Sequence, residues 1–162
     1  MENQSLHTAD CIENVVKMYS NMVYRLAFAQ TRNKSDADDT FQEVFMRYIK
    51  KKPKFETEEH RKAWLIRVTI NCSKKLWAST WRRRTEELDE SIAFEMGDDK
   101  SLHDELQQLP AKYRAVIHLF YYEDLSIEEI SVVLKQKPST IRTQLTRGRR
   151  KLKEILKEGY DV

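Results

Sequence analysis

Residues 125–153 read LSIEEISVVLKQKPSTIRTQLTRGRRKLK, and they carry the clearest structural signal in the chain. Ser126 and Glu129 have the spacing of a capping box, in which each side chain binds the other residue's backbone N–H. Apolar residues then recur at helical spacing. Pro138 suits the first position of a second helix, because its missing N–H leaves no helical bond unmade there. The stretch therefore predicts two helices joined by a tight turn.

The second of these helices is expected to have two chemically different faces. At about 100° per residue, Ile141, Leu145, Gly148 and Leu152 fall on one side, and hydroxyls and arginines fall on the other. This arrangement matches a helix-turn-helix, whose second helix presents side chains to base edges and phosphates. The residues predicted to bind duplex DNA are Ser139, Thr140, Arg142, Thr143, Thr146, Arg147 and Arg150.

An ordinary solvated helix is the plainer interpretation of this pattern. Residues 137–157 contain eight basic residues against Glu154 alone. Solvated helices usually mix signs, because opposite charges three or four residues apart attract. The one-sided charge favours DNA binding over the plainer interpretation.

The composition predicts an all-α protein. Glycine and proline number only three each, and β-branched runs with period two are absent. Cys11 and Cys72 lie far apart, which indicates reduced thiols in a cytoplasmic protein rather than metal ligands. No apolar run approaches the roughly 20 residues of a membrane span, and the N-terminus is not that of a signal peptide. We expect no membrane insertion, no metal and no cofactor.

Two further helices are expected near the start of the chain, at residues 10–32 and from Ser35 to about residue 50. The second has its cap at Ser35 and acids in its first turn, where the helix dipole favours them. Its apolar side is expected to consist of Phe41, Val44, Phe45, Tyr48 and Ile49. The opposite side is polar, and a polar helix face is by itself more often only solvated. The residues of that surface are Asp36, Asp39, Gln42, Glu43 and Arg47.

A long basic helix is expected at about residues 60–81. Residues 61–84 contain eight basic residues, no acid and all three tryptophans. Cations interleaved with aromatic rings suit single-stranded nucleic acid, since the cations neutralise phosphates and the rings stack on bases. Trp64 is expected in the core, and the roles of Trp77 and Trp81 stay undecided. Lys74 and Lys75 are better candidates for backbone contact than either of these tryptophans for stacking.

An acidic segment separates the two basic regions. Residues 85–101 hold seven acids and one lysine with little periodicity, which predicts a flexible linker. We therefore expect two small helical domains, at residues 1–84 and 102–162. In the second, short helices at residues 102–109 and 110–122 would brace the helix-turn-helix.

Three blocks in this order resemble the extracytoplasmic-function sigma factors, which are promoter-specificity subunits of bacterial RNA polymerase. The first block is DADDTFQEVF at residues 36–45, and the second is AWLIRVTIN at residues 63–71. The third joins Leu109-Pro110 to the helix-turn-helix and to TIRTQLTRGR at residues 140–149. The resemblance extends from about Tyr19 to Leu156. Gly148 departs from the alanine usual in the family.

The resemblance implies partners and roles that the residues alone leave open. Asp36, Asp39, Gln42, Glu43 and Arg47 would dock on the β′ clamp helices of core RNA polymerase, whose β subunit is also an expected partner. The C-terminal domain would read the minus-35 element as duplex DNA. Whether an anti-sigma factor also binds is left open. The residues expected to hold the melted minus-10 strand are Phe55, His60, Arg67, Asn71, Lys74 and Lys75.

Two other classes of protein remain as alternatives. A stand-alone helix-turn-helix regulator would bind duplex DNA without polymerase, but it leaves the basic aromatic helix without a role. An enzyme such as a recombinase would need a catalytic constellation. The four scattered histidines have no metal-ligand spacing, so we expect no catalysis by this chain.

Overall fold

The computed structural model describes residues 10–31, 33–84 and 105–160, with side chains described at 12–31, 33–76 and 105–158. Over these ranges the chain is helical and contains no strand, so the predicted all-α class is confirmed. The helices are α2 (Asp10–Thr31), α3 (Lys34–Lys51), α4 (Glu58–Arg84), α6 (Ala111–Ile117), the π-helical η2 (His118–Tyr122), α7 (Ile127–Leu134) and α8 (Pro138–Tyr160).

Helices α2, α3 and α4 pack on one another to form the N-terminal unit. Val23, Leu26, Val44 and Leu65 are fully buried between them, as their helical spacing predicts. Ile49 was expected on the apolar side of α3, but it is 41% exposed. The predicted helices therefore exist, while one edge of the α3 packing face was misplaced.

Helix α3 begins one residue earlier than predicted. Asn33, not Ser35, is the N-cap, and its side chain accepts a hydrogen bond of 2.8 Å from the backbone N–H of Asp36. The Asn33 amide in turn donates to the Asp36 carboxylate at 2.8 Å. The first bond satisfies the backbone N–H of Asp36, one of the open donors of the first turn, and the second holds the two side chains together.

The C-terminal unit contains the predicted helix-turn-helix. The capping box of Ser126 and Glu129 is present at the start of α7, and Lys135, the C-cap after its last residue, has the left-handed conformation. Pro138 is the first residue of α8. Ile141 and Leu145 are buried, and Gly148 lies so close to α6 that a Cβ there would be 2.8 Å from Ile117 Cδ1.

The helix predicted at residues 110–122 is not uniform. It is α-helical at Ala111–Ile117 and π-helical at His118–Tyr122. The backbone N–H of Glu123 donates to the carbonyl of His118 at 3.2 Å, the i→i+5 bond of a π-turn. Nothing in the hydrophobic spacing predicts the extra residue.

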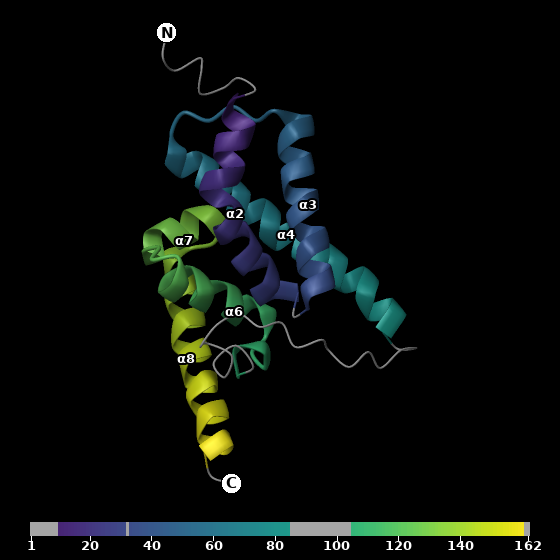
Figure 1. The fold of residues 1–162 in the computed structure, drawn as a ribbon. Helices are drawn as coiled ribbons and strands as arrows, with labels where there is room; N and C mark the ends of the chain where they lie inside the picture. The colour runs from purple at the N-terminus through teal and green to yellow at the C-terminus, as the bar shows by residue number, and fades with distance from the viewer. Residues whose placement is uncertain (1–9, 32, 85–104, 161–162) are drawn as a thin grey trace.

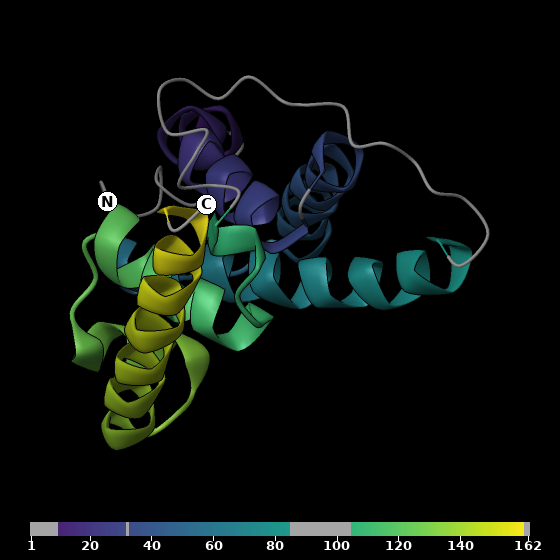
Figure 2. The same ribbon diagram turned by 90° about the horizontal axis from the view of Figure 1, so that it is seen from below.

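The two units lie against each other (Figures 1 and 2). Helix α4 packs on α7, and α2 packs on α6. One contiguous cluster of buried apolar residues extends from Val15 in α2 to Leu145 in α8. Helix α8 and the C-terminal half of α4 project from this body in different directions (Figure 2).

Several sequence predictions fall outside the described residues. The linker at residues 85–101 and its two domain boundaries lie there, as do the side chains of Cys11, Trp77 and Trp81. Within the described ranges, none of the helices has the length and apolarity that a membrane span requires. The same ranges hold no cluster of histidine, cysteine or acidic side chains suited to a metal ion.

Candidate nucleic-acid and protein interfaces

The outer face of α8 carries all the residues that the sequence predicted to bind duplex DNA. Each of the seven is exposed, while Ile141 and Leu145 on the opposite side are buried. Thr143 Oγ1 donates to the Ser139 carbonyl at 3.0 Å, and Thr146 Oγ1 donates to the Arg142 carbonyl at 2.9 Å. These bonds fix the hydroxyls and leave their oxygens able to accept from a base edge or amide. The helix therefore offers acceptors and cations on one side.

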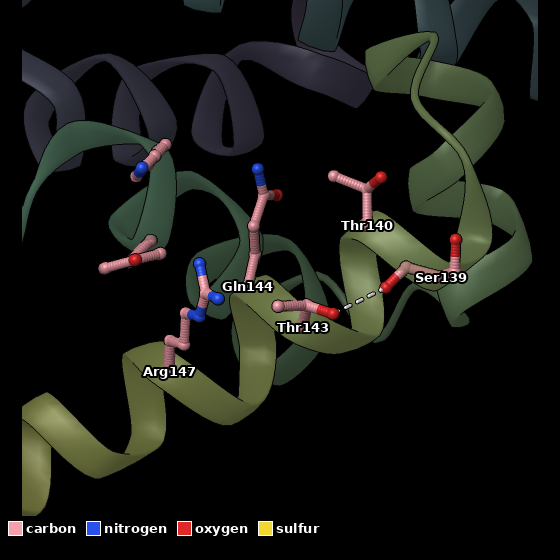
Figure 3. Close-up of a pocket in the computed structure, with 7 residues that line it drawn as sticks. Ser139, Thr140, Thr143, Gln144 and Arg147 are labelled. Atoms are coloured by element: carbon pink, nitrogen blue, oxygen red, sulfur yellow. Dashed lines mark hydrogen bonds between the residues drawn. The ribbon is translucent and has the colours of Figure 1, made fainter.

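A pocket of about 350 Å³ lies between the N-terminal half of α8 and the start of α6 (Figure 3). In this view, Thr140, Gln144 and Arg147 extend from α8 toward the same side. Gln144 Oε1 is buried and has no hydrogen-bond partner among the residues described. The lining residues are Lys112, Tyr113, Ser139, Thr140, Thr143, Gln144 and Arg147.

Lys112, Tyr113 and Gln144 were missed by sequence reasoning. Gln144 falls between the two faces of the α8 wheel, and Lys112 belongs to another helix. The Lys112 ammonium lies 5.1 Å from the centroid of the Tyr113 ring, where the π-face attracts a cation. No acid lines the pocket, so its charge is positive.

Arg149 is held away from this face. Its Nε donates to the Tyr121 hydroxyl at 2.6 Å, and its guanidinium lies 5.4 Å from the ring centroids of both Phe120 and Tyr121. The position of Arg149 on the flank of the predicted duplex-binding face is explained by this packing.

The basic side chains of α4 differ in how exposed they are, and therefore in whether they can contact a nucleic acid. Lys74 and Lys75 are exposed, and so are His60 and Asn71. Arg67 is partly buried, because its Nε donates to the Val133 carbonyl at 3.0 Å and its Nη2 to the Val132 carbonyl at 3.5 Å. The sequence placed Arg67 on an open strand-binding surface, and the structure instead engages it with the C-terminal end of α7.

The Phe55 ring also packs against other side chains of the protein. Its ring centroid lies 6.3 Å from that of Tyr48 and 6.1 Å from that of Trp64. The guanidinium of Arg61 lies 5.6 Å from the Phe55 ring centroid. Trp64 packs against the core, as expected. Phe55 is therefore half-buried and presents only part of its ring to solvent.

Arg61 is buried and belongs to a polar network at the start of α4. It pairs with Glu58, which accepts a hydrogen bond of 2.8 Å from the Tyr19 hydroxyl. Burial, together with this hydrogen bond to a carboxylate, raises the pKa of Tyr19 to about 12. Arg61 thus serves the fold, although the sequence counts it among the basic residues of α4.

The outer face of α3 brings four of the five predicted docking residues together. Asp39, Gln42 and Glu43 are exposed, and Arg47 Nε lies 2.8 Å from Glu43 Oε1. The hydrogen bond from Arg47 lowers the pKa of Glu43 and keeps it ionised. Asp36 does not belong to this face, because it is buried and caps the helix with Asn33.

Two apolar side chains accompany these polar residues. Met46 is 48% exposed and Ile49 is 41% exposed on the same helix. Methionine is enriched at surfaces that contact another protein. Sequence periodicity missed Met46 and placed Ile49 in the core.

Comparisons with known proteins match both units. Residues 15–83 match the family described as Sigma-70 region 2, and residues 99–152 match the family described as Sigma-70, region 4. The chain is 31% identical over 157 residues to the ECF RNA polymerase sigma factor SigE of Mycolicibacterium smegmatis, covering 89% of this chain and 61% of that protein. It is 29% identical over 131 residues to the RNA polymerase sigma factor SigV of Bacillus subtilis, covering 77% of this chain and 78% of SigV.

The fold is also similar to solved structures. One is the sigma factor RpoE in complex with the anti-sigma factor NepR from Bartonella quintana, with a TM-score of 0.71 and 23% identity over 90% of this chain and 96% of that one. Another is CnrH in complex with the cytosolic domain of CnrY, with a TM-score of 0.72 and 20% identity over 93% of this chain and 90% of CnrH.

The chain contains sigma-70 region 2 followed by sigma-70 region 4, and this order of regions defines a class of protein. The chain belongs to the sigma-70 family of RNA polymerase sigma factors, in its extracytoplasmic-function group. Proteins of this family give RNA polymerase its promoter specificity and act in transcription initiation. The function predicted from the sequence is confirmed at this level, in preference to a stand-alone helix-turn-helix regulator.

Proposed function

We propose that the chain assigns three surfaces to three tasks in initiation. The outer face of α8 reads the minus-35 element as duplex, the exposed part of α4 holds the melted minus-10 strand, and α3 docks on core polymerase. The observation that carries the proposal is the α8 face, where seven exposed polar and basic residues lie opposite a buried apolar stripe.

On α8, the seven predicted DNA-binding residues fall into two groups, one placed to contact base edges and one placed to contact phosphates. Ser139, Thr140, Arg142 and Thr143 lie in the first turns, where a recognition helix meets base edges. Arg147 and Arg150 lie further along and bind phosphates. The pocket beside them extends the site onto α6, because Lys112 and Arg147 both line it and a phosphate between them would be neutralised from two helices.

On α4, Asn71, Lys74 and Lys75 form the available part of the minus-10 surface, with His60 at its start. The lysines neutralise the backbone of the melted strand, and Asn71 can hydrogen-bond a splayed base. Phe55 contributes the exposed part of its ring. Arg67 joins this surface only when it leaves α7.

On α3, Asp39, Gln42, Glu43 and Arg47 contact the clamp helices of the β′ subunit, and Met46 supplies apolar area to the same contact. The mixed charges favour a partner that offers both signs and orient it through complementary potential. Asp36 supports this surface by starting the helix.

The proposal also covers the domains, the other partners and the chemistry of initiation. Residues 1–84 and 102–162 act as separate domains joined by the acidic segment 85–101. The β subunit and an anti-sigma factor are further partners in the cytoplasm. Core polymerase performs the chemistry, and this chain performs no catalysis of its own.

Run-off transcription on a random promoter library tests the proposal directly. The chain should make core polymerase initiate at templates that share two sequence elements, and the selected templates report both. Core polymerase that stays silent on the library with the purified chain present would contradict the proposal.

Charge reversal on α3 tests the docking surface separately. Asp39→Lys and Glu43→Lys should each weaken the affinity for core polymerase about tenfold or more, while circular dichroism stays unchanged. Glu13→Lys changes the same charge on exposed α2 and is the matched control. Equal affinities for the three variants, measured by fluorescence anisotropy, would remove α3 as the docking helix.

A further inference from the structure

The loop between α3 and α4 places the Phe55 ring against three side chains of the N-terminal unit. Its ring centroid lies 6.3 Å from that of Tyr48, with 25° between the ring planes, and 6.1 Å from that of Trp64, with 64° between the planes. The guanidinium carbon of Arg61 lies 5.6 Å from the Phe55 centroid, within the range of a cation–π contact. Two aromatic rings and one cation therefore determine where the half-buried ring lies.

The Arg61 guanidinium is itself held by a second contact. Its Nη1 donates to Glu58 Oε1, and the Tyr19 hydroxyl donates to the other oxygen of this carboxylate, Oε2, at 2.8 Å. Glu58 therefore connects the start of α4 to α2 through both of its oxygens. Only 5% of Arg61 and 8% of Tyr19 are exposed, so neither side chain is placed to contact a nucleic acid. The cation beside Phe55 is thus fixed by a hydroxyl that comes from another helix.

We propose that Arg61 is a positioning residue for strand binding, which holds the Phe55 ring in the orientation that stacks on a base of the melted strand. The proposal rests on the minus-10 role given to Phe55 above. A ring carried by a loop stacks best when its orientation is already fixed, because ordering it during binding costs conformational entropy. Arg61 fixes that orientation without touching the strand, and Glu58 and Tyr19 hold Arg61 in place.

Two other roles for Arg61 would give different results. A contact with phosphate would make strand affinity depend on Arg61 whether or not the strand carries bases. A purely structural role would lower the population of folded chain and weaken the binding of every strand by the same factor. A positioning role instead changes only the part of the affinity that comes from the bases.

That part is measured on the full chain with two labelled strands, one of twelve thymidine nucleotides and one of twelve abasic sugar–phosphate units. Both strands carry the same backbone charge, so the ratio of their affinities reports stacking rather than phosphate contact. The unaltered chain should prefer the thymidine strand about fivefold or more, and Phe55→Leu should reduce this preference to about twofold or less. Arg61→Gln should reduce the ratio to nearly the same value as Phe55→Leu.

Tyr19→Phe tests the support of Arg61 from a position that does not meet the strand. It removes the hydroxyl that holds Glu58 but keeps the ring and the net charge, and it should reduce the ratio to about half that of the unaltered chain. Lys74→Ala is the contrasting variant, because loss of a phosphate contact should weaken the binding of both strands alike and leave the ratio unchanged. Circular dichroism of each variant shows that binding is measured on folded chain.

The double variant Phe55→Leu with Arg61→Gln separates action through the ring from independent action. If Arg61 acts through Phe55, the double variant should have the same ratio as Phe55→Leu alone. A further decrease in the double variant, or a high ratio that Arg61→Gln leaves unchanged, would overturn the positioning role and leave the role of Phe55 intact. A ratio of about one in the unaltered chain would overturn the minus-10 role of Phe55 and this proposal with it. The two failures are therefore distinguishable.

Discussion

Helices α4 and α8 carry similar positive charge in the sequence, yet the structure uses their cations differently. In α4, Arg61 is buried and pairs with Glu58, and Arg67 donates to a carbonyl at the end of α7. In α8, Arg142 and Arg147 are exposed, and no acid lies within ion-pair distance of either among the described residues. The number of basic residues in a helix therefore does not by itself show how many can bind nucleic acid. A basic side chain that already pairs with an acid or a backbone carbonyl of the protein is not free to contact a phosphate.

The largest effect is expected on α8. Arg147→Ala should weaken binding to the minus-35 duplex by about tenfold or more and reduce the slope of log affinity against log salt by about 0.9. Arg149→Ala removes the same charge from the same helix, but Arg149 is engaged by Tyr121 and should matter less. Anisotropy titrations at several salt concentrations measure both. Equal slopes for the two variants would erase the distinction between available and engaged arginines.

A smaller effect is expected on α4. Lys74→Ala and Lys75→Ala should each weaken binding of the melted strand by roughly threefold and reduce its salt slope by about 0.7. Arg61→Gln should leave that slope unchanged and lower the free energy of unfolding by about 1 kcal/mol, because the buried Arg61 side chain loses its hydrogen bond to the half-exposed Glu58. If the dependence of strand affinity on salt changes in Arg61→Gln but not in the two lysine variants, then the buried arginine, and not the exposed lysines, contacts the strand.

The pocket between α6 and α8 predicts a further decrease. Lys112→Ala should weaken duplex binding by about threefold through loss of one phosphate contact. Lys157→Ala, exposed at the far end of α8, is the charge-matched control. If the two substitutions have the same effect on duplex affinity, the pocket has no role beyond general charge.

The smallest effect concerns acid stability. Burial alone would raise the pKa of Glu123, but nearby His118 and Arg25 outweigh burial and lower it. A carboxyl whose native pKa is depressed contributes stability above its unfolded pKa, about 4.3, and loses it as pH falls through the native value. Urea unfolding should therefore show a smaller loss of stability between about pH 5 and 3 in Glu123→Gln than in the unaltered chain. An identical loss in both would exclude the contribution of this carboxylate.

Much of the fold followed from local patterns. The capping box at Ser126, Pro138 at the start of α8 and the stripe from Ile141 to Leu145 are short-range signals, and all are present in the structure. The π-turn at His118–Tyr122 gave no such signal. The N-cap of α3 is Asn33 rather than Ser35, because both side chains can accept a backbone hydrogen bond and the sequence alone does not choose between them.

The candidate surfaces were less predictable where two units meet. Helical spacing showed which side of α4 faces its own core, but it contains no information about α7, so Arg67 looked open. Lys112 and Gln144 were missed for a related reason, since the pocket arises only when α6 lies beside α8. Asp36 was assigned by motif, and its burial depends on the cap at Asn33.

The π-turn lies directly before Glu123, which contacts Arg25 of the other unit, so this contact depends on the length of the chain in the turn. A π-turn contains one residue more than the α-helix that it interrupts. Deleting one residue from His118–Tyr122 would restore regular winding and rotate Glu123 by about 100° relative to Arg25. The loss of a single codon at this site would therefore change the contact between the two units, without any change to the surfaces proposed to bind DNA and polymerase.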